Sequence, residues 1–430
     1  MVLNNIYVPP EILDIIVGLL AEDEDTDSIK ALALACRTFL GACRARLFAT
    51  IDLTPSYVHG QDCKAEYNAF RAKVDRLKRV FNANPSVVHL VRNVTYMFLR
   101  CDHNTQEFHH VLGTLTRVKS LVLRGAQKDT TIYRTSVDWS TLSSTLRQSI
   151  IHILQLSTLK QLCLDQVVNF PLSALISSPN ITHLTIESAD FEDGIISSNA
   201  ESSSSTRPPG GTSSPDERNV LRLSSLVFTD YSSGAVMTLI KAEDENGKPA
   251  VDLSQLVTLE SLDKTGEMVV PTLLDTSQHL ETLSCTVWDT FNNPFRDLLK
   301  PHTLKTLKIF KPIIVIPPWL GDLSIDPYYS LPSEFAKWAA CNILERIEIT
   351  INVEQNAKIP MTPASWTALN NLADASHFPY LSAVGLRIYI HEETAWAKEV
   401  KKTLESQQQE IFEDLCTTSR LDFQLVIELL

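Results

Sequence analysis

The chain has 430 residues, and its 38 basic and 51 acidic side chains give a formal net charge of −13. This length suggests two or three ordinary domains or one elongated repeat array, because single hydrophobic cores stop growing at roughly 250–300 residues. An apolar content of 44% and a charged content of 21% are typical of folded proteins. The acidic balance argues against nucleic-acid binding, which needs clustered lysine and arginine.

The first 50 residues are expected to form three short helices. Pro9 and Pro10 followed by Glu11 indicate a helix start, because proline is tolerated in the first turn and acidic groups favour the positive end of a helix. One apolar face of this helix follows from residues at helical spacing, namely Ile12, Ile15, Ile16 and Leu19. The acidic run 22–27 is expected to be a solvated loop. A second helix should then end near Phe39, and a third segment should cover 42–48, so that the helical domain spans residues 1–55.

A longer amphipathic helix is predicted over 61–83, where it would link the helical domain to the first repeat. Its apolar residues recur every three or four positions: Tyr67, Phe70, Val74, Leu77, Val80 and Phe81. Its other face carries five basic residues: Arg71, Lys73, Arg76, Lys78 and Arg79. A phosphate-binding surface and an ordinary solvated face are both compatible with this pattern, and the acidic chain favours the solvated face.

One pattern, apolar-x-x-apolar-x-apolar, recurs through residues 87–430. Complete copies begin at Val91, Val118, Leu159, Ile181, Leu223, Leu280, Leu304, Leu344 and Leu381. A damaged copy is expected at Leu259 and Leu262, with Lys264 in the third position. Short intervals, such as the 22 residues from Leu159 to Ile181, are typical of leucine-rich repeats.

Helical segments between these copies predict an α/β fold, an irregular leucine-rich-repeat solenoid or horseshoe with parallel strands. The stretch 197–219 is rich in serine, proline and glycine, so it is expected to be a disordered insertion. A helix over about 392–416 is expected to cap the end of the array.

Side chains between the apolar positions of each strand should face the concave surface, where solenoids commonly bind partners. The candidate target-binding residues on this surface are Arg124, Asp165, Glu187, Lys308, Phe310, Glu348 and Arg387.

The sequence contains no constellation that indicates catalysis, and we expect no enzyme activity, cofactor or metal. It has no dinucleotide fingerprint, no phosphate-binding loop and no Gly-x-Ser-x-Gly elbow. The densest group of ligand types is Cys101, Asp102, His103, His109 and His110, for which a solvated loop is favoured over a zinc site. No apolar run reaches the ~20 residues that cross a bilayer, so no membrane association is expected. Eight scattered cysteines without a signal peptide indicate the cytoplasm or nucleus.

The first 50 residues resemble an F-box. Residues 8–13 (Val-Pro-Pro-Glu-Ile-Leu) resemble the opening Leu-Pro-x-Glu-Ile/Leu-Leu of that family, and residues 33–39 (Ala-Leu-Ala-Cys-Arg-Thr-Phe) resemble its Leu-x-x-Cys-Arg-x-Trp segment. Arg46, Leu47 and Phe48, with Ile51, resemble its closing segment. The departures are Val8 for leucine and Phe39 for tryptophan. The layout with a following repeat array resembles the leucine-rich-repeat F-box proteins common in fungi.

This resemblance implies a substrate-recognition subunit of a Skp-cullin-F-box ubiquitin ligase. The N-terminal helices would bind the Skp-type adaptor, and through it a cullin, while the repeats would bind an unknown protein target. Carried over residue by residue, the adaptor contacts would be Pro9, Glu11, Ile12, Leu13, Ile16, Leu34, Cys36, Phe39 and Leu47. Three short helices bury little surface, which is consistent with a face completed by a partner.

Two alternatives stay open from the sequence. A leucine-rich-repeat scaffold could bind proteins without any ubiquitin-ligase role, since it would use the same repeats. An enzyme on a parallel β-solenoid is disfavoured, because no clustered set of aspartate and glutamate accompanies the strands.

Overall fold

The computed structural model describes residues 9–23, 25–35, 37–54, 63–98, 106–125, 136–178, 180–192, 220–229, 231–244, 246–262, 269–286, 303–313, 331, 335, 343–353, 367–391 and 395–430. It is an α/β structure that divides into two compact units. The first unit comprises Met1–Arg222 and Lys241–Val251, and the second comprises Leu223–Ile240 and Asp252–Leu430. The expected insertion 197–219 lies outside the described residues. In the described part of the chain, no helix is long and apolar enough to cross a membrane.

The first unit begins with three helices: α1 (Pro10–Glu22), α2 (Thr26–Ala35) and α3 (Leu40–Leu47). Three helices were predicted, but α2 ends at Ala35 rather than near Phe39, and the expected loop 22–27 is shorter, because α2 begins at Thr26. Pro9 precedes α1, and Pro10 occupies its first turn, where a missing backbone N–H leaves no bond unmade. Asp25 caps α2, since its Oδ1 accepts a hydrogen bond from the backbone N–H of Ser28 at 2.9 Å. The three helices share a small core of Val17, Ile29 and Cys43.

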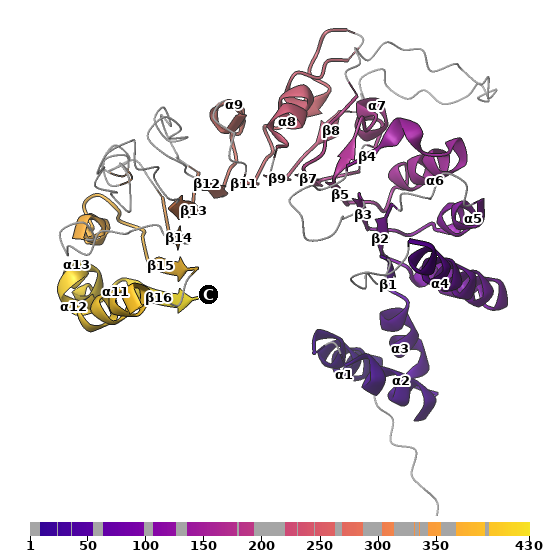
Figure 1. Cartoon of the computed structure of the whole chain (residues 1–430), viewed down its shortest axis with the longest axis horizontal. Helices are drawn as coiled ribbons and strands as arrows, with labels where there is room; N and C mark the ends of the chain where they lie inside the picture. Colours follow the sequence, from indigo (N-terminus) through magenta and orange to yellow (C-terminus); the bar gives the residue numbers. More distant parts are fainter. Residues whose placement is uncertain are drawn as a thin grey trace, which may run out of the picture. The chain divides into compact units, whose positions relative to one another are not determined.

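Five parallel strands follow in the first unit: β1 (Thr50–Leu53), β2 (Asn93–Met97), β3 (Ser120–Arg124), β5 (Gln161–Asp165) and β7 (His183–Glu187). The connecting helices lie on one side of these strands (Figure 1): α4 (Cys63–Ala83), α5 (Gln106–Thr114), α6 (Ser144–Leu154) and α7 (Leu172–Ile176). The shorter elements are η1 (Pro85–Leu90), β4 (Val137–Asp138), η3 (Trp139–Thr141) and β6 (Val167–Val168). Ile51 pairs with Val94, so the segment that ends the predicted helical domain is the first strand of the sheet.

Seven parallel strands belong to the second unit: β9 (Ser225–Thr229), β11 (Thr258–Leu262), β12 (Thr282–Thr286), β13 (Thr306–Ile313), β14 (Arg346–Val353), β15 (Ala383–Ile390) and β16 (Asp422–Leu429). Its helices are α8 (Ser233–Ile240), α9 (Val269–Thr276), η6 (Thr367–Ala373), α11 (Ala395–Ser406), α12 (Gln408–Ile411) and α13 (Glu413–Thr417). Two short strands, β8 (Leu221–Arg222) and β10 (Val251–Asp252), pair with each other. The expected α/β fold with parallel strands is confirmed.

The repeated apolar pattern places its three apolar positions in the core. Val118, Leu121 and Leu123 are all fully buried, and Leu121 and Leu123 are in register with their counterparts on the neighbouring strands. The residue after the leading apolar position of a copy accepts two hydrogen bonds at its backbone carbonyl oxygen, both from the next strand. Lys119, for example, accepts from the N–H groups of Lys160 and Gln161 at 2.8 and 3.0 Å. The spacing therefore sets both the core and the start of each strand pair.

The strand register corrects the positions predicted for the damaged copy. Leu259 pairs with Leu226 and Leu283, so Leu256 leads this copy and Ser261 takes the third position. Both Leu256 and Ser261 are buried, whereas Leu262 lies on the opposite face of β11 because side chains alternate along a strand. Lys264, which was expected in the third position, is outside the described residues.

The structure also corrects the prediction of one C-terminal helix. The predicted segment 392–416 contains three short helices, and β16 follows them as a further strand, paired along its length with β15. The apolar pattern missed β16 because Arg420 occupies the leading position, three residues before Phe423. Its guanidinium donates to the carbonyl oxygens of Phe378 at 2.6 Å and Ala373 at 2.9 Å. The helices therefore precede the last strand rather than closing the array.

Candidate functional site

The helix α1 has an uncovered apolar stripe. Ile12, Ile15, Ile16 and Leu19 are between 38% and 58% exposed. At about 100° per residue these four positions fall within one sector of the helix. The stripe is the face that the sequence identified by its spacing, and the structure leaves it open to solvent.

The neighbouring sector of α1 is apolar as well and faces the interior. Val17 is fully buried, Leu20 packs against the core of the three helices, and Leu13 is 4% exposed. Leu13, which the resemblance places in the adaptor contact, is therefore not on the open surface, because it lies about 100° from Ile12 on the side of Val17. A helix that is apolar on two adjacent sides and covered on only one presents a surface suited to a partner.

The other expected adaptor contacts are divided between surface and interior. Pro9 and Glu11 are exposed, and Leu34 on α2 is 90% exposed. Phe39 and Leu47 are partly buried against the core of Val17, Ile29 and Cys43, so only part of each side chain is open. Cys36 lies outside the described residues. Of the expected apolar contacts, Ile12 and Ile16 are thus exposed on α1 and Leu34 is exposed on α2, whereas Ile15 and Leu19, which complete the α1 stripe, were not among them.

The capping acid Asp25 sits between α1 and α2. Hydrogen bonds from the side chain and backbone of Ser28 lower the pKa of Asp25 below its ordinary value. The carboxylate therefore stays charged at the positive end of α2, where it stabilises the helix start. This local contact fixes the start of α2, the helix that carries Leu34.

The polar strand face of the first unit brings together three candidate residues. Arg124, Asp165 and Glu187 are paired in register across β3, β5 and β7. Arg124 Nε lies 3.6 Å from Asp165 Oδ2, and Arg124 is the most exposed of the three. The row therefore presents one basic and two acidic groups side by side.

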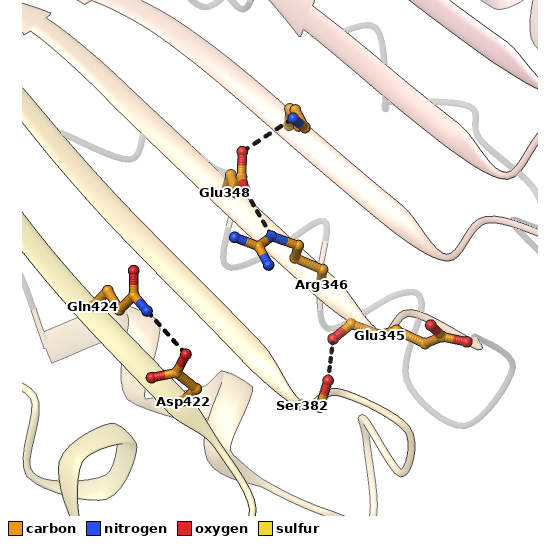
Figure 2. Close-up of polar contacts among 7 residues, drawn as sticks. Glu345, Arg346, Glu348, Ser382, Asp422 and Gln424 are labelled. Atoms are coloured by element: carbon orange, nitrogen blue, oxygen red, sulfur yellow. Dashed lines mark hydrogen bonds and ion pairs between the residues drawn. The ribbon is translucent and has the colours of Figure 1, made fainter. Parts of the chain in front are cut away.

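The corresponding face of the second unit carries a tighter ionic group (Figure 2). Glu348 accepts a hydrogen bond from Arg346 Nε at 2.6 Å, and its other oxygen lies 3.3 Å from Lys308 Nζ on the adjacent strand. Burial by itself would raise the pKa of Glu348, but the hydrogen bond from Arg346 and the charge of Lys308 lower it. Glu348 is thus held ionised between two cations.

The remaining candidates of the second unit lie one rung further along the strands. Phe310, Thr350 and Arg387 are in register across β13, β14 and β15. Phe310 is partly exposed and Arg387 is exposed. Arg387 makes no ion pair with any residue that the structure describes.

One cysteine, Cys163, lies on the polar strand face of the first unit. Cys163 lies between Val122 and Thr185 in register, and burial together with the charges of Glu187 and Asp165 raises its pKa to about 12. A thiol held neutral in this way is a poor nucleophile. Over the described ranges, no three histidine, cysteine, aspartate or glutamate side chains are grouped to hold a metal.

The structure describes two histidines, His109 and His110, of the segment for which a solvated loop was expected. His109 belongs to α5, where it is buried and lies 3.2 Å from the hydroxyl of Ser143, and His110 is exposed on the same helix. The two rings therefore point to different environments. Cys101, Asp102 and His103 lie outside the described residues.

Comparison with known proteins adds no relative. The chain matches no family model, and no curated protein is significantly similar to it.

Proposed function

We propose that this chain is the substrate-recognition subunit of a Skp-cullin-F-box ubiquitin ligase. Helices α1–α3 would form the F-box-like domain that binds a Skp-type adaptor, and through it a cullin. The strands and helices that follow would form a leucine-rich-repeat domain that binds the target protein. The observation that carries the proposal is the apolar stripe of α1, which is exposed although the adjacent side of the same helix already lies in the core.

Covering this stripe would supply binding energy. Complete burial of one isoleucine or leucine side chain contributes roughly 1.5–3 kcal/mol, and these side chains are already about half covered. A partner that covers all four would therefore gain several kcal/mol, with a further contribution from Leu34. Part of that gain offsets the entropy lost on association. Residues around the stripe match the F-box pattern at Pro9, Glu11 and Ile12.

The polar strand faces support a protein target. Charged side chains of both signs stand in rows, with Arg124 beside Asp165 in one unit and Arg346 and Lys308 around Glu348 in the other. A target surface with charges of both signs would complement these rows. The chain itself would perform no bond chemistry, because holding a target near the ubiquitin donor raises the effective concentration of the reacting groups.

The test is co-expression with a Skp-type adaptor, followed by affinity purification. Ile12→Asp with Ile16→Asp places two charges on the stripe and should remove the adaptor and the cullin from the pull-down. The matched control is Gly41→Asp with Ala45→Asp, two exposed positions of α3 with the same spacing and the same change in charge. This control should keep the adaptor bound.

Two results would overturn the proposal. Adaptor binding that survives Ile12→Asp with Ile16→Asp would show that α1 is not the contact. A chain that captures protein partners without adaptor or cullin would instead be a leucine-rich-repeat scaffold with no ligase role.

A further inference from the structure

The strand β16 is an open edge of the sheet in the second unit. The N–H of Asp422 donates to the carbonyl of Ser382 at 2.8 Å, and the N–H of Leu430 donates to that of Ile390 at 2.9 Å. Even-numbered residues of β16 therefore bond to β15. Because backbone groups alternate along a strand, the odd-numbered residues direct their N–H and C=O groups to the open side. No described strand pairs with that side. A row of such groups is a template for an additional strand.

The apolar side chains of β16 are only half covered. Of Phe423, Leu425, Ile427 and Leu429, Ile427 alone is buried, whereas all four of the corresponding residues of β15 are buried. Phe423 contacts Phe412, with ring centroids 5.1 Å apart. The row is therefore covered by β15 and the C-terminal helices and left open at the edge. A further strand with apolar side chains would complete it.

Three lysines stand beside this edge. An open cavity of about 470 Å³ lies between α11 and Leu429, and it is lined by Lys398, Lys401, Lys402, Glu405, Ser406 and Leu429. Lys401 Nζ lies 3.7 Å from Glu405, the only acidic residue of the lining. Lys402 makes no ion pair within the described ranges. In a chain of net charge −13, this is a local excess of positive charge.

We propose that the edge of β16 and the three lysines form a docking site for an extended acidic segment of a partner protein. The segment would add to the sheet as the next strand, with backbone hydrogen bonds to the odd-numbered residues of β16. Its side chains on the α11 side would be apolar beside Phe423 and Leu425, and acidic beside Leu429, where they reach the lysines. This site lies in the second unit and is separate from the α1 stripe.

Charge favours this occupant over a second copy of the chain. In an edge-to-edge pair of two copies, the second β16 would present Phe423, Leu425, Ile427 and Leu429 on the α11 side, and these side chains carry no acidic group to neutralise the lysines. Lysines at sheet edges also commonly oppose such pairing. An acidic segment would instead neutralise them. Since the lysines are near the surface, binding should weaken as the salt concentration rises.

Fluorescence polarisation with the full chain tests the proposal. The probe is a fluorescein-labelled peptide, Thr-Val-Thr-Val-Thr-Glu-Thr-Glu, whose valines and glutamates share one face of a strand. This Val-Glu peptide is compared with a Val-Lys peptide, in which lysine replaces both glutamates. The Val-Glu peptide should bind at least tenfold more tightly than the Val-Lys peptide. Lys398→Glu with Lys402→Glu should weaken its binding at least tenfold. The control Lys73→Glu with Lys78→Glu makes the same charge change on α4 and should leave binding unchanged.

A pair of proline variants tests the edge itself. Leu425→Pro removes an N–H that points to the open side, so it should weaken peptide binding at least tenfold with little change in Tm. Gln424→Pro removes an N–H that bonds to β15, so it should lower Tm clearly more. If Leu425→Pro does not fold, the lysine variants still decide the proposal.

The outcomes are distinct. Equal binding of the two peptides, or no binding of either, overturns the proposal. Val-Glu binding that the lysine changes weaken but a folded Leu425→Pro leaves unchanged overturns strand addition. A dimer that Leu425→Pro converts to a monomer assigns the edge to a second copy and also overturns the proposal. Ile12→Asp with Ile16→Asp should not change peptide binding, so failure here is separable from failure of the ligase proposal.

Discussion

The guanidinium of Arg420 donates a hydrogen bond to the carbonyl oxygen of Phe378, 42 residues earlier in the chain, at 2.6 Å. A second nitrogen of the same group donates to the carbonyl of Ala373 at 2.9 Å. In the earlier copies the leading position is apolar and buried, as at Leu381. Arg420 replaces that packing with hydrogen bonds to the turn before β15, and so ties the last strand to its neighbour.

Arg420→Met should therefore destabilise the chain. Methionine keeps the apolar stem but leaves the carbonyls of Phe378 and Ala373 without these donors. Hydrogen bonds from charged groups contribute about 1.5–3 kcal/mol, so a loss of about 2 kcal/mol is expected in urea unfolding. Arg387→Met, on the exposed face of the same sheet, should change stability by less than about 0.5 kcal/mol. Similar values for the two variants would contradict this role.

The two apolar sides of α1 should respond differently to truncation. Leu13→Ala removes a buried side chain and should cost about 2–5 kcal/mol. Ile15→Ala removes an exposed one and should cost less than about 0.5 kcal/mol. Thermal unfolding followed by circular dichroism measures both. A large loss for Ile15→Ala would mean that the stripe already packs against this chain.

The ion pairs of Glu348 with Arg346 and Lys308 should make the free energy of unfolding depend on pH in the acid range. Because the folded pKa of Glu348 is lowered from its ordinary 4.5, the unfolded chain takes up its proton first as the pH falls. The stabilisation is thus fully present above pH 4.5 and is lost as the pH drops through the lower folded pKa. Glu348→Gln should flatten this part of the curve. Denaturant titrations between pH 3 and 7 should show that difference, and identical slopes for both proteins would exclude it.

The described cysteines should differ in reactivity. Cys416 is exposed, whereas burial raises the pKa of Cys163 to about 12 and also raises that of the buried Cys285. The thiolate is the reactive form, so at pH 8 iodoacetamide should modify Cys416 at least about 100-fold faster than Cys163. Peptide mass spectrometry over time measures the two rates. Equally fast labelling of Cys163 and Cys416 would contradict this difference in reactivity.

The sequence by itself predicted most strands of the sheet, although not β1 or β16. The pattern apolar-x-x-apolar-x-apolar places one face of each strand in a core. The helical segments between copies require the strands to pair in parallel. The start of α1 also followed from local chemistry, since Pro9 and Pro10 act within one helical turn. The polar positions Arg124, Asp165 and Glu187 came from the same alternation, which operates over neighbouring residues.

Only the tertiary structure decided which side of α1 stays open. Periodicity assigns Ile12 and Leu13 to different sectors, but both sectors are apolar, and the packing of α2 and α3 selects the one with Val17 as the core. Likewise, Ser261 and Arg420 occupy positions that are apolar in the complete copies, and strand register identified them. The ion pair of Lys308 with Glu348 joins residues 40 apart, so it depends on how long each connection between strands is. Local spacing sets which residues share a face, whereas the contacts of that face are set by elements distant in the chain.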